Sequence, residues 1–513
     1  MWTPNRRRFL AQVGRGMLVA GVGSACVHEM GLVSRGDMID GADPLDFGAL
    51  EPLVALMQET PIDKLQPVLL EKHRNGTSLK TLTAAGALAN ARTFGGHDYV
   101  GYHALMALVP ALQMSREMPG EQAPLPVLKV LYRNSHKIQV NGGRAAEMLH
   151  ELHAAEELAE HHPELRQLVH ELKYEEAEKA LARKTMEDPR EAYNDLQHII
   201  QDDLNVHRVV LAWRAWDILR ITGEEHALTM LRQSVRFCID EELDVAKGTR
   251  AEPAIRKVLP KLMDRYNLAA GKSGTREGDD TWLEELAQVV YGGSREQAAD
   301  AVASALADGY NPSQVGEAIA LAANLLVLRD PGRQQGDAER PVGSVHGASV
   351  GVHASDAANA WRHIAGVSNP RNAMASLIVG AYHTAGQSRG QLDDAYPLAE
   401  HAAKVKANDK EGLLAELDDC VQQNDQSTAA AIVAAYGEAG HDARPVFDMF
   451  LRYAVSEDGA LHAEKFYRTV AEEFAATRPS FRWRHLVALA RVTASEHGFA
   501  APGYDQAKQL VTG

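Results

Sequence analysis

The chain has few cysteines and no long apolar run, and each scarcity excludes a class of protein. Its 513 residues include only Cys26, Cys238 and Cys420. Cysteines this few and this far apart cannot build a disulfide framework or a Cys-rich zinc site, and no Cys-x-x-Cys-His haem attachment occurs. No apolar run reaches the roughly 20 residues that a membrane-spanning helix needs, so we expect no stable membrane insertion of the mature chain. Its stability must therefore come from packing.

Positive charge is also in deficit. Lys and Arg number 53 against 69 Asp and Glu, which gives a formal net charge of −16. A surface of this sign repels phosphate backbones, and no basic stripe offsets it, so we expect no nucleic-acid partner. The abundant residue is histidine, with 22 copies.

The N-terminal segment has the pattern of an export signal. Asn5-Arg6-Arg7-Arg8-Phe9-Leu10 is followed by a short apolar run over residues 17–22 and by the small residues Gly23-Ser24-Ala25. This order resembles a cleavable twin-arginine signal over residues 1–30, which predicts the twin-arginine export machinery as a partner and a periplasmic or otherwise exported protein. A lipoprotein acylated at Cys26 is the alternative, although Gly23 stands where a lipobox normally has Leu.

The rest of the chain has the apolar spacing of helices. Ser78 is placed to cap a helix in which Leu79, Leu82 and Ala85 recur at helical spacing. The same periodicity predicts helices over residues 65–72, 144–184, 191–221, 226–241, 281–307, 312–328, 372–384, 412–422, 428–437 and 462–476. Stretches rich in Gly and charge predict loops over 268–280 and 330–345.

The two halves of the chain match each other. Four histidines of the first half recur in the second after steps of 247 to 255 residues. The matching pairs are His97 and His346, His103 and His353, His136 and His383, and His207 and His462. We therefore predict an all-α, internally duplicated helical bundle or solenoid-like array, with halves at 31–267 and 281–513 joined by a linker at 268–280.

Histidines repeated in this way indicate a metal site. A neutral imidazole offers one nitrogen to a metal while the other bonds to a surrounding group. In Asp203-x-x-x-His207 and Asp458-x-x-x-His462 the four-residue spacing puts the carboxylate and the ring on one helix face. The aspartate could then orient the ring or be a metal ligand itself.

Three segments carry a resemblance to a known family. Val352–Arg362 resembles the His-Ala-x-Thr…Ala-Leu-Arg segment of questin oxidase-like proteins, and Asp458–Phe466 resembles their late Asp-x-His-x-x-Lys segment. Gly96–Leu105 is similar to their early histidine region. Together these segments cover about a tenth of the chain.

The resemblance implies a helical, oxygen-dependent oxidoreductase that acts on a small organic molecule, in the family an aromatic polyketide such as an anthraquinone. It also implies a non-haem iron, Fe(II), held by histidines and a carbamylated lysine, here Lys465. His462 and Lys465 lie three residues apart, so on a helix both can face one centre. The first half has Val210 at the corresponding place. The candidate ligands are His97, His103, His353, His383, His462 and Lys465, followed by His346, His136 and His207.

Two other interpretations remain open. Glu147-x-x-His150 and Asp195-x-x-His198 have the spacing of a ferritin-like di-metal oxidase. Repeated helix pairs are also typical of a helical-repeat binding scaffold without catalysis.

Overall fold

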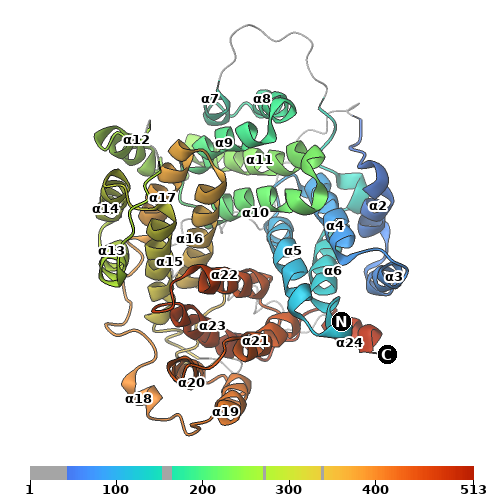
Figure 1. Cartoon of the computed structure of the whole chain (residues 1–513). Helices are drawn as coiled ribbons and strands as arrows, with labels where there is room; N and C mark the ends of the chain where they lie inside the picture. Colours follow the sequence, from blue (N-terminus) through green and yellow to red (C-terminus); the bar gives the residue numbers. More distant parts are fainter. Residues whose placement is uncertain (1–42, 153–163, 270–272, 337–339, 513) are drawn as a thin grey trace.

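A computed structural model describes residues 43–152, 164–269, 273–336 and 340–512 of the chain (Figure 1). Within these ranges the chain is helical, with three isolated β-bridges and no strand, which confirms the all-α prediction. The predicted signal segment, residues 1–30, lies outside the described residues.

The first half supplies eleven of the described α-helices. These are α2 (Glu51–Glu59), α3 (Ile62–Arg74), α4 (Leu79–Phe94), α5 (Tyr99–Glu117), α6 (Leu125–Val140), α7 (Leu165–His170), α8 (Tyr174–Glu187), α9 (Pro189–Ile200), α10 (Val206–Thr222), α11 (Ala227–Ala246) and α12 (Ile255–Arg265).

The second half supplies twelve. These are α13 (Asp280–Gly292), α14 (Arg295–Ala307), α15 (Pro312–Leu328), α16 (Val350–Val367), α17 (Pro370–Thr384), α18 (Ala399–Ala402), α19 (Lys410–Gln422), α20 (Gln426–Glu438), α21 (Arg444–Ser456), α22 (His462–Ala476), α23 (Trp483–Glu496) and α24 (Tyr504–Thr512).

Local sequence explains where several helices begin and break. Ser78 accepts a hydrogen bond from the Thr81 backbone N–H and caps α4, as predicted. The helix predicted over 281–307 is wrong as one element, because Gly292-Gly293 ends α13 and Ser294 starts α14 with a capping box. The helix predicted over 191–221 is interrupted between α9 and α10, because apolar spacing alone does not reveal a short turn between two helices. The prediction over 144–184 is wrong for residues 147–152, which lie outside any helix, and a turn separates α7 from α8.

Two sets of helices, one in each half, show the same pattern of packing. Helices α4, α5 and α6 pack against one another, and so do α15, α16 and α17. The pair α10 and α11 packs on α4, as the pair α22 and α23 packs on α15. This is the packing that a duplicated chain would produce.

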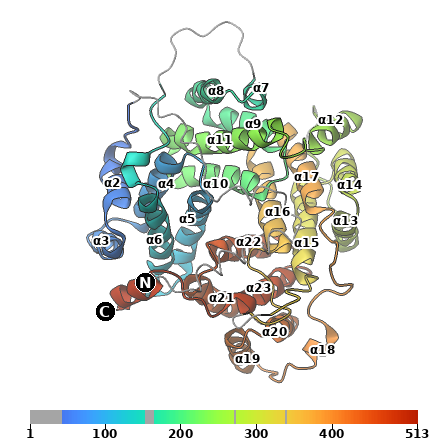
Figure 2. The same cartoon turned by 180° about the vertical axis from the view of Figure 1, so that it is seen from behind.

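Helices of each half also pack on helices of the other half. Helix α10 of the first half packs on α16 of the second, and α22 of the second packs on α5 of the first. The last helix of each half does the same, because α12 packs on α14 and α17, whereas α24 packs on α3 and α6. Figures 1 and 2 show α5, α10, α16 and α22 arranged around the middle of the molecule from both sides.

A buried ion pair fixes the crossing of the two halves. Lys129 of α6 lies 2.7 Å from the Glu464 carboxylate of α22, and both side chains are buried. The Lys129 ammonium also donates hydrogen bonds to the carbonyls of Ala454 and Glu457, just before α22. The start of α22 is thereby tied to the first half.

Across the described ranges, each helix falls short of the length or the apolarity that spanning a bilayer requires.

Candidate metal centre

Four histidines from four different helices meet where the halves cross. They are His103 of α5, His207 of α10, His353 of α16 and His462 of α22. The ring centroid of His103 lies 4.8 Å from that of His207 and 5.0 Å from that of His462. His353 lies 5.7 Å from His207 and 5.3 Å from His462. We call these four residues the histidine cluster.

Each histidine of the cluster stands in the first two turns of its helix, and two of the four helices follow a residue with a positive φ angle. Asp98 and Leu461, the residues that precede α5 and α22, both have φ near 67°, which is uncommon for residues other than glycine. The Asp98 carboxylate compensates on α5 by accepting a hydrogen bond from the Gly101 N–H. Asn205 caps α10 by accepting from the His207 N–H itself.

Hydrogen bonding leaves ring nitrogens of the cluster available to a metal. His103 Nδ1 lies 2.7 Å from the Tyr99 carbonyl oxygen, to which it donates. Its Nε2 is then the unprotonated nitrogen of a neutral ring, and it is buried with no hydrogen-bond partner. His207 Nε2 is buried without a partner as well. Such orphaned acceptors inside a protein call for an explanation, and a metal ion is one.

One distance in the cluster equals the separation of two ligands on one ion. His353 Nε2 and His462 Nε2 lie 3.3 Å apart. With metal–nitrogen bonds of about 2.1 Å, two ligand nitrogens on one ion lie roughly 3.0 to 3.4 Å apart. Among the described residues no three His, Cys, Asp or Glu side chains are placed so that they could hold a metal ion together. What favours a metal here is the donor type of the four side chains and the separation of this one pair of nitrogens.

Burial keeps the cluster neutral. It holds the pKa of His103, His207 and His462 well below the ordinary value and lowers the pKa of His353 to about 3. The nearby charge of Lys465 lowers the pKa of all four further. Neutral imidazoles are the form that binds metals.

Lys465 is buried beside the cluster on α22, one turn after His462. Burial lowers the pKa of its amine to about 8, against the opposing charges of Asp356 and Glu464. Asp356 is buried on α16 one turn after His353, and it accepts a 2.7 Å hydrogen bond from the Thr469 hydroxyl of α22. Asp356 and Thr469 therefore join the two helices that carry His353, His462 and the lysine.

Two tyrosines cover the first-half side of the cluster. The Tyr99 ring lies 4.1 Å from His103, and the Tyr102 ring lies 5.3 Å from His207, centroid to centroid. Phe237 packs edge-on against Tyr102 at 5.5 Å. Aromatic rings therefore exclude water from this side.

Three other predicted ligands already use their accepting ring nitrogens in hydrogen bonds. His346 Nδ1 accepts from the Ala348 N–H, and His383 Nδ1 accepts from the Trp361 Nε1–H. His97 bonds through Nδ1 to Asp240 and accepts through Nε2 from Arg236. A neutral imidazole has one accepting nitrogen, so none of these three rings offers it to a metal as arranged.

His136 is not brought to the cluster. It is exposed on α6 and stacks on Tyr132. The structure thus gathers His103, His207, His353, His462 and Lys465, and leaves His97, His136, His346 and His383 outside the set.

Sequence reasoning missed Asp356, Thr469, Lys129 and Glu464 as supports of the centre. Helical spacing gives a signal for two of them, because Asp356 follows His353 by three residues and Thr469 follows Lys465 by four. Nothing in the sequence links Lys129 to Glu464, 335 residues away.

The ferritin-like motifs are not arranged as that interpretation requires. Glu147 and His150 lie outside any helix, and Glu147 is held 3.0 Å from the Arg92 guanidinium. Asp195 and His198 do lie on α9, but Asp195 forms an ion pair with Lys184.

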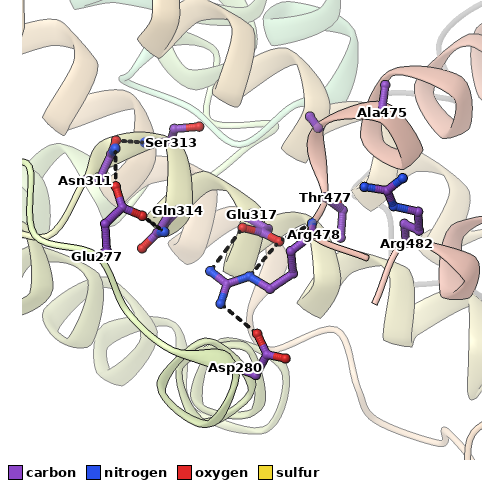
Figure 3. Close-up of a pocket in the computed structure, with 11 residues that line it drawn as sticks. Glu277, Asp280, Asn311, Ser313, Gln314, Glu317, Ala475, Thr477, Arg478 and Arg482 are labelled. Carbon is purple, nitrogen blue, oxygen red and sulfur yellow. Dashed lines mark hydrogen bonds and ion pairs between the residues drawn. The ribbon is translucent and has the colours of Figure 1, made fainter. Parts of the chain in front are cut away.

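A groove of about 580 Å³ lies at the surface, between the start of α15 and the end of α22 (Figure 3). Its charged side chains bond to one another. The Arg478 guanidinium donates to Glu317 and Asp280, and Gln314 donates to Glu277. We do not assign a ligand to this groove.

Histidine burial outside the cluster predicts a pH dependence of stability. Burial lowers the pKa of His485, on α23, to about 4 against the opposing charge of Glu473, whereas an unfolded histidine has a pKa of about 6.5. As pH falls the unfolded chain takes up this proton first, so the stabilisation is complete above pH ~6.5 and is lost toward pH ~4. Removing this imidazole should therefore reduce the loss of unfolding free energy between pH ~6.5 and pH ~4 by roughly 3 kcal/mol.

Urea unfolding of the metal-free chain at pH 7 and pH 4.5 checks this expectation. His485→Gln, which can still bond to Thr477, should lose less stability on acidification than the parent chain. The exposed His136→Gln is the matched control. Equal losses in His485→Gln and the parent would contradict the prediction.

Comparison of the chain with protein-family models, with curated proteins and with solved structures found no match.

Proposed function

We propose that this chain is an exported, metal-dependent oxidoreductase that uses a non-haem Fe(II) to oxidise an organic molecule with dioxygen. The observation that carries the proposal is the histidine cluster, in which four imidazoles from four helices, two of them buried and two half-buried, meet with ring centroids 4.8 to 5.7 Å apart. The resemblance to questin oxidase-like proteins favours an aromatic substrate.

His103, His207, His353 and His462 would hold the metal. Histidines with one hard oxygen donor suit Fe(II) better than the softer metals that thiolates select. When bound, the iron would supply an open coordination position and the electrons that dioxygen chemistry needs.

Lys465 would supply the oxygen donor as a carbamate. A neutral amine adds to carbon dioxide with a new N–C bond and the loss of one proton, and the product carries a carboxylate-like group. Burial of Lys465 favours the neutral amine that this addition needs. The position beside His353 and His462 supports this role for the lysine.

Other side chains of the centre orient and shield it. The Tyr99 carbonyl fixes which nitrogen of His103 faces the cluster. The Asp356–Thr469 hydrogen bond holds α16 against α22. The rings of Tyr99, Tyr102 and Phe237 exclude water on one side, as a site for reactive oxygen chemistry requires.

We also propose that the two halves arose by duplication of one helical unit. Two features support this origin. The set α4–α6 packs in the same way as the set α15–α17, and the last helix of each half, α12 or α24, packs on the other half. On this proposal each half contributes two histidines to the cluster from corresponding helices, and only the second half contributes a lysine.

Metal analysis of the folded chain tests the proposed function. Protein purified without oxygen and loaded with Fe(II) should hold about one iron per chain and should consume dioxygen when aromatic compounds are added. Two irons per chain would instead support the ferritin-like interpretation. No bound metal under any loading condition would refute the metal-dependent function and favour a helical scaffold.

A further inference from the structure

A small apolar cavity lies against the histidine cluster on the second-half side. His462, which is 3% exposed, is one of its lining residues, together with Phe466 of α22 and Leu489 and Val492 of α23. Its volume is about 40 Å³. Partly exposed residues, among them Glu457, Thr493 and Glu496, lie at its outer edge.

The chemistry of the wall favours an uncharged apolar occupant. The carboxylates at the edge are already engaged. Glu496 accepts from the Gly347 N–H and pairs with Arg333 and Arg340, and Glu457 accepts from the N–H groups of Gly498 and Phe499. Neither carboxylate is free to bind a cation, and the inner wall has no basic group for an anion.

The volume limits the size of the occupant. A cavity needs roughly 10 to 15 Å³ to hold one water, and a cavity that binds benzene is about 150 Å³. The space beside His462 therefore admits a diatomic molecule and excludes even a single aromatic ring. The organic substrate must reach the centre elsewhere.

The corresponding place in the first half is filled. The step of 250 residues that relates His103 to His353 also relates Tyr102 to Val352. The step of 255 residues that relates His207 to His462 also relates Phe237 to Val492. Two aromatic rings packed edge to face thus lie on one side of the cluster, whereas valines stand at the matching sequence positions of the second half, and one of them, Val492, lines the cavity.

We infer that this cavity is the route and waiting site for dioxygen at the centre. The inference rests on the proposed function, because it assigns the entry of one substrate to that same site. It uses the asymmetry of the two halves: aromatic rings block the first-half approach, and Val492, in place of a ring, leaves the second-half approach open.

The first test uses xenon as a stand-in for dioxygen, because xenon binds dry apolar cavities whether or not a metal is present. Crystals of the full chain under xenon pressure should show a xenon atom beside Phe466, Leu489 and Val492. Val492→Phe, which introduces the ring found at Phe237, should abolish it. Ala463 also lines the cavity, and Ala463→Val is the milder variant if the larger ring impairs folding. Absence of xenon in the parent chain would overturn the inference.

The second test measures dioxygen reactivity of the Fe(II)-loaded chain. Val492→Phe and Ala463→Val should retain the parent iron content and react with dioxygen at least about tenfold more slowly. Val140→Phe, the same change at an exposed position at the end of α6, is the matched control and should not slow the reaction. An unchanged rate in the Val492 and Ala463 variants with full iron content would overturn the inference alone. A chain that takes up xenon but no iron would refute the proposed function and the route with it.

Discussion

His462→Ala should abolish iron binding while leaving the chain folded enough to assay. The substitution removes one of two ring nitrogens that face each other across 3.3 Å, and it leaves His353 without its partner. Loss of a group that only orients a ligand weakens metal binding by about 10- to 100-fold, so loss of a ligand itself should weaken it at least as much. His353→Ala should have the same effect.

The controls separate a ligand from a packed core histidine. His136→Ala removes an exposed ring and His97→Ala removes a ring that pairs with Asp240, so both should retain the parent iron content. Iron is measured by elemental analysis after gel filtration, and folding by circular dichroism. His462→Gln fills more of the vacated space and guards against collapse of α22. Full iron content in a folded His462→Ala chain would contradict the proposed ligand set.

Replacing Arg6 and Arg7 together with lysine should retain the chain in the cytoplasm. The twin-arginine route reads the guanidinium pair, and lysine keeps the charge but not the planar, multidentate donor geometry. Export should therefore fall by more than about tenfold although the net charge of the segment is unchanged.

Cell fractionation of a host that has this export route measures the outcome, with an antibody against the folded chain. Arg8→Lys lies beside the pair and is the matched control, which should still be exported. Cys26→Ser discriminates the lipoprotein alternative, because it would release an acylated protein from the membrane fraction and would not affect a cleaved soluble one. Normal export of the double lysine variant would contradict the twin-arginine interpretation.

Much of the fold could be predicted because helical periodicity is a local property. The caps at Ser78 and the loops around 268–280 and 330–345 were available from spacing and composition alone. The break between α13 and α14 was readable in Gly292-Gly293-Ser294, but apolar spacing continues across it and hid the turn. Which helices exchange between halves depends on contacts hundreds of residues apart, which no local pattern encodes.

The candidate centre was predictable in part for the same reason. Matching the halves proposed His103, His207, His353 and His462 as two related pairs, and the structure brings them together. The match proposed His97 and His136 equally, because spacing along the chain does not show which way a ring faces. His97 follows Gly95-Gly96, whose left-handed backbone lets it turn toward Asp240 and Arg236 on α11. His136 lies on a face of α6 that faces solvent.

The reciprocal docking of α12 and α24 has a consequence for the newly made chain. While residues after 461 are still in the ribosome, α5 lacks α22, α3 and α6 lack α24, and the cluster lacks its fourth ring. If the cluster binds iron as proposed, an incomplete chain would have no place to retain the ion, and occupancy of the centre would show that synthesis has finished. If the chain is also exported in the folded state, as proposed, occupancy would distinguish a finished chain from an unfinished one before export.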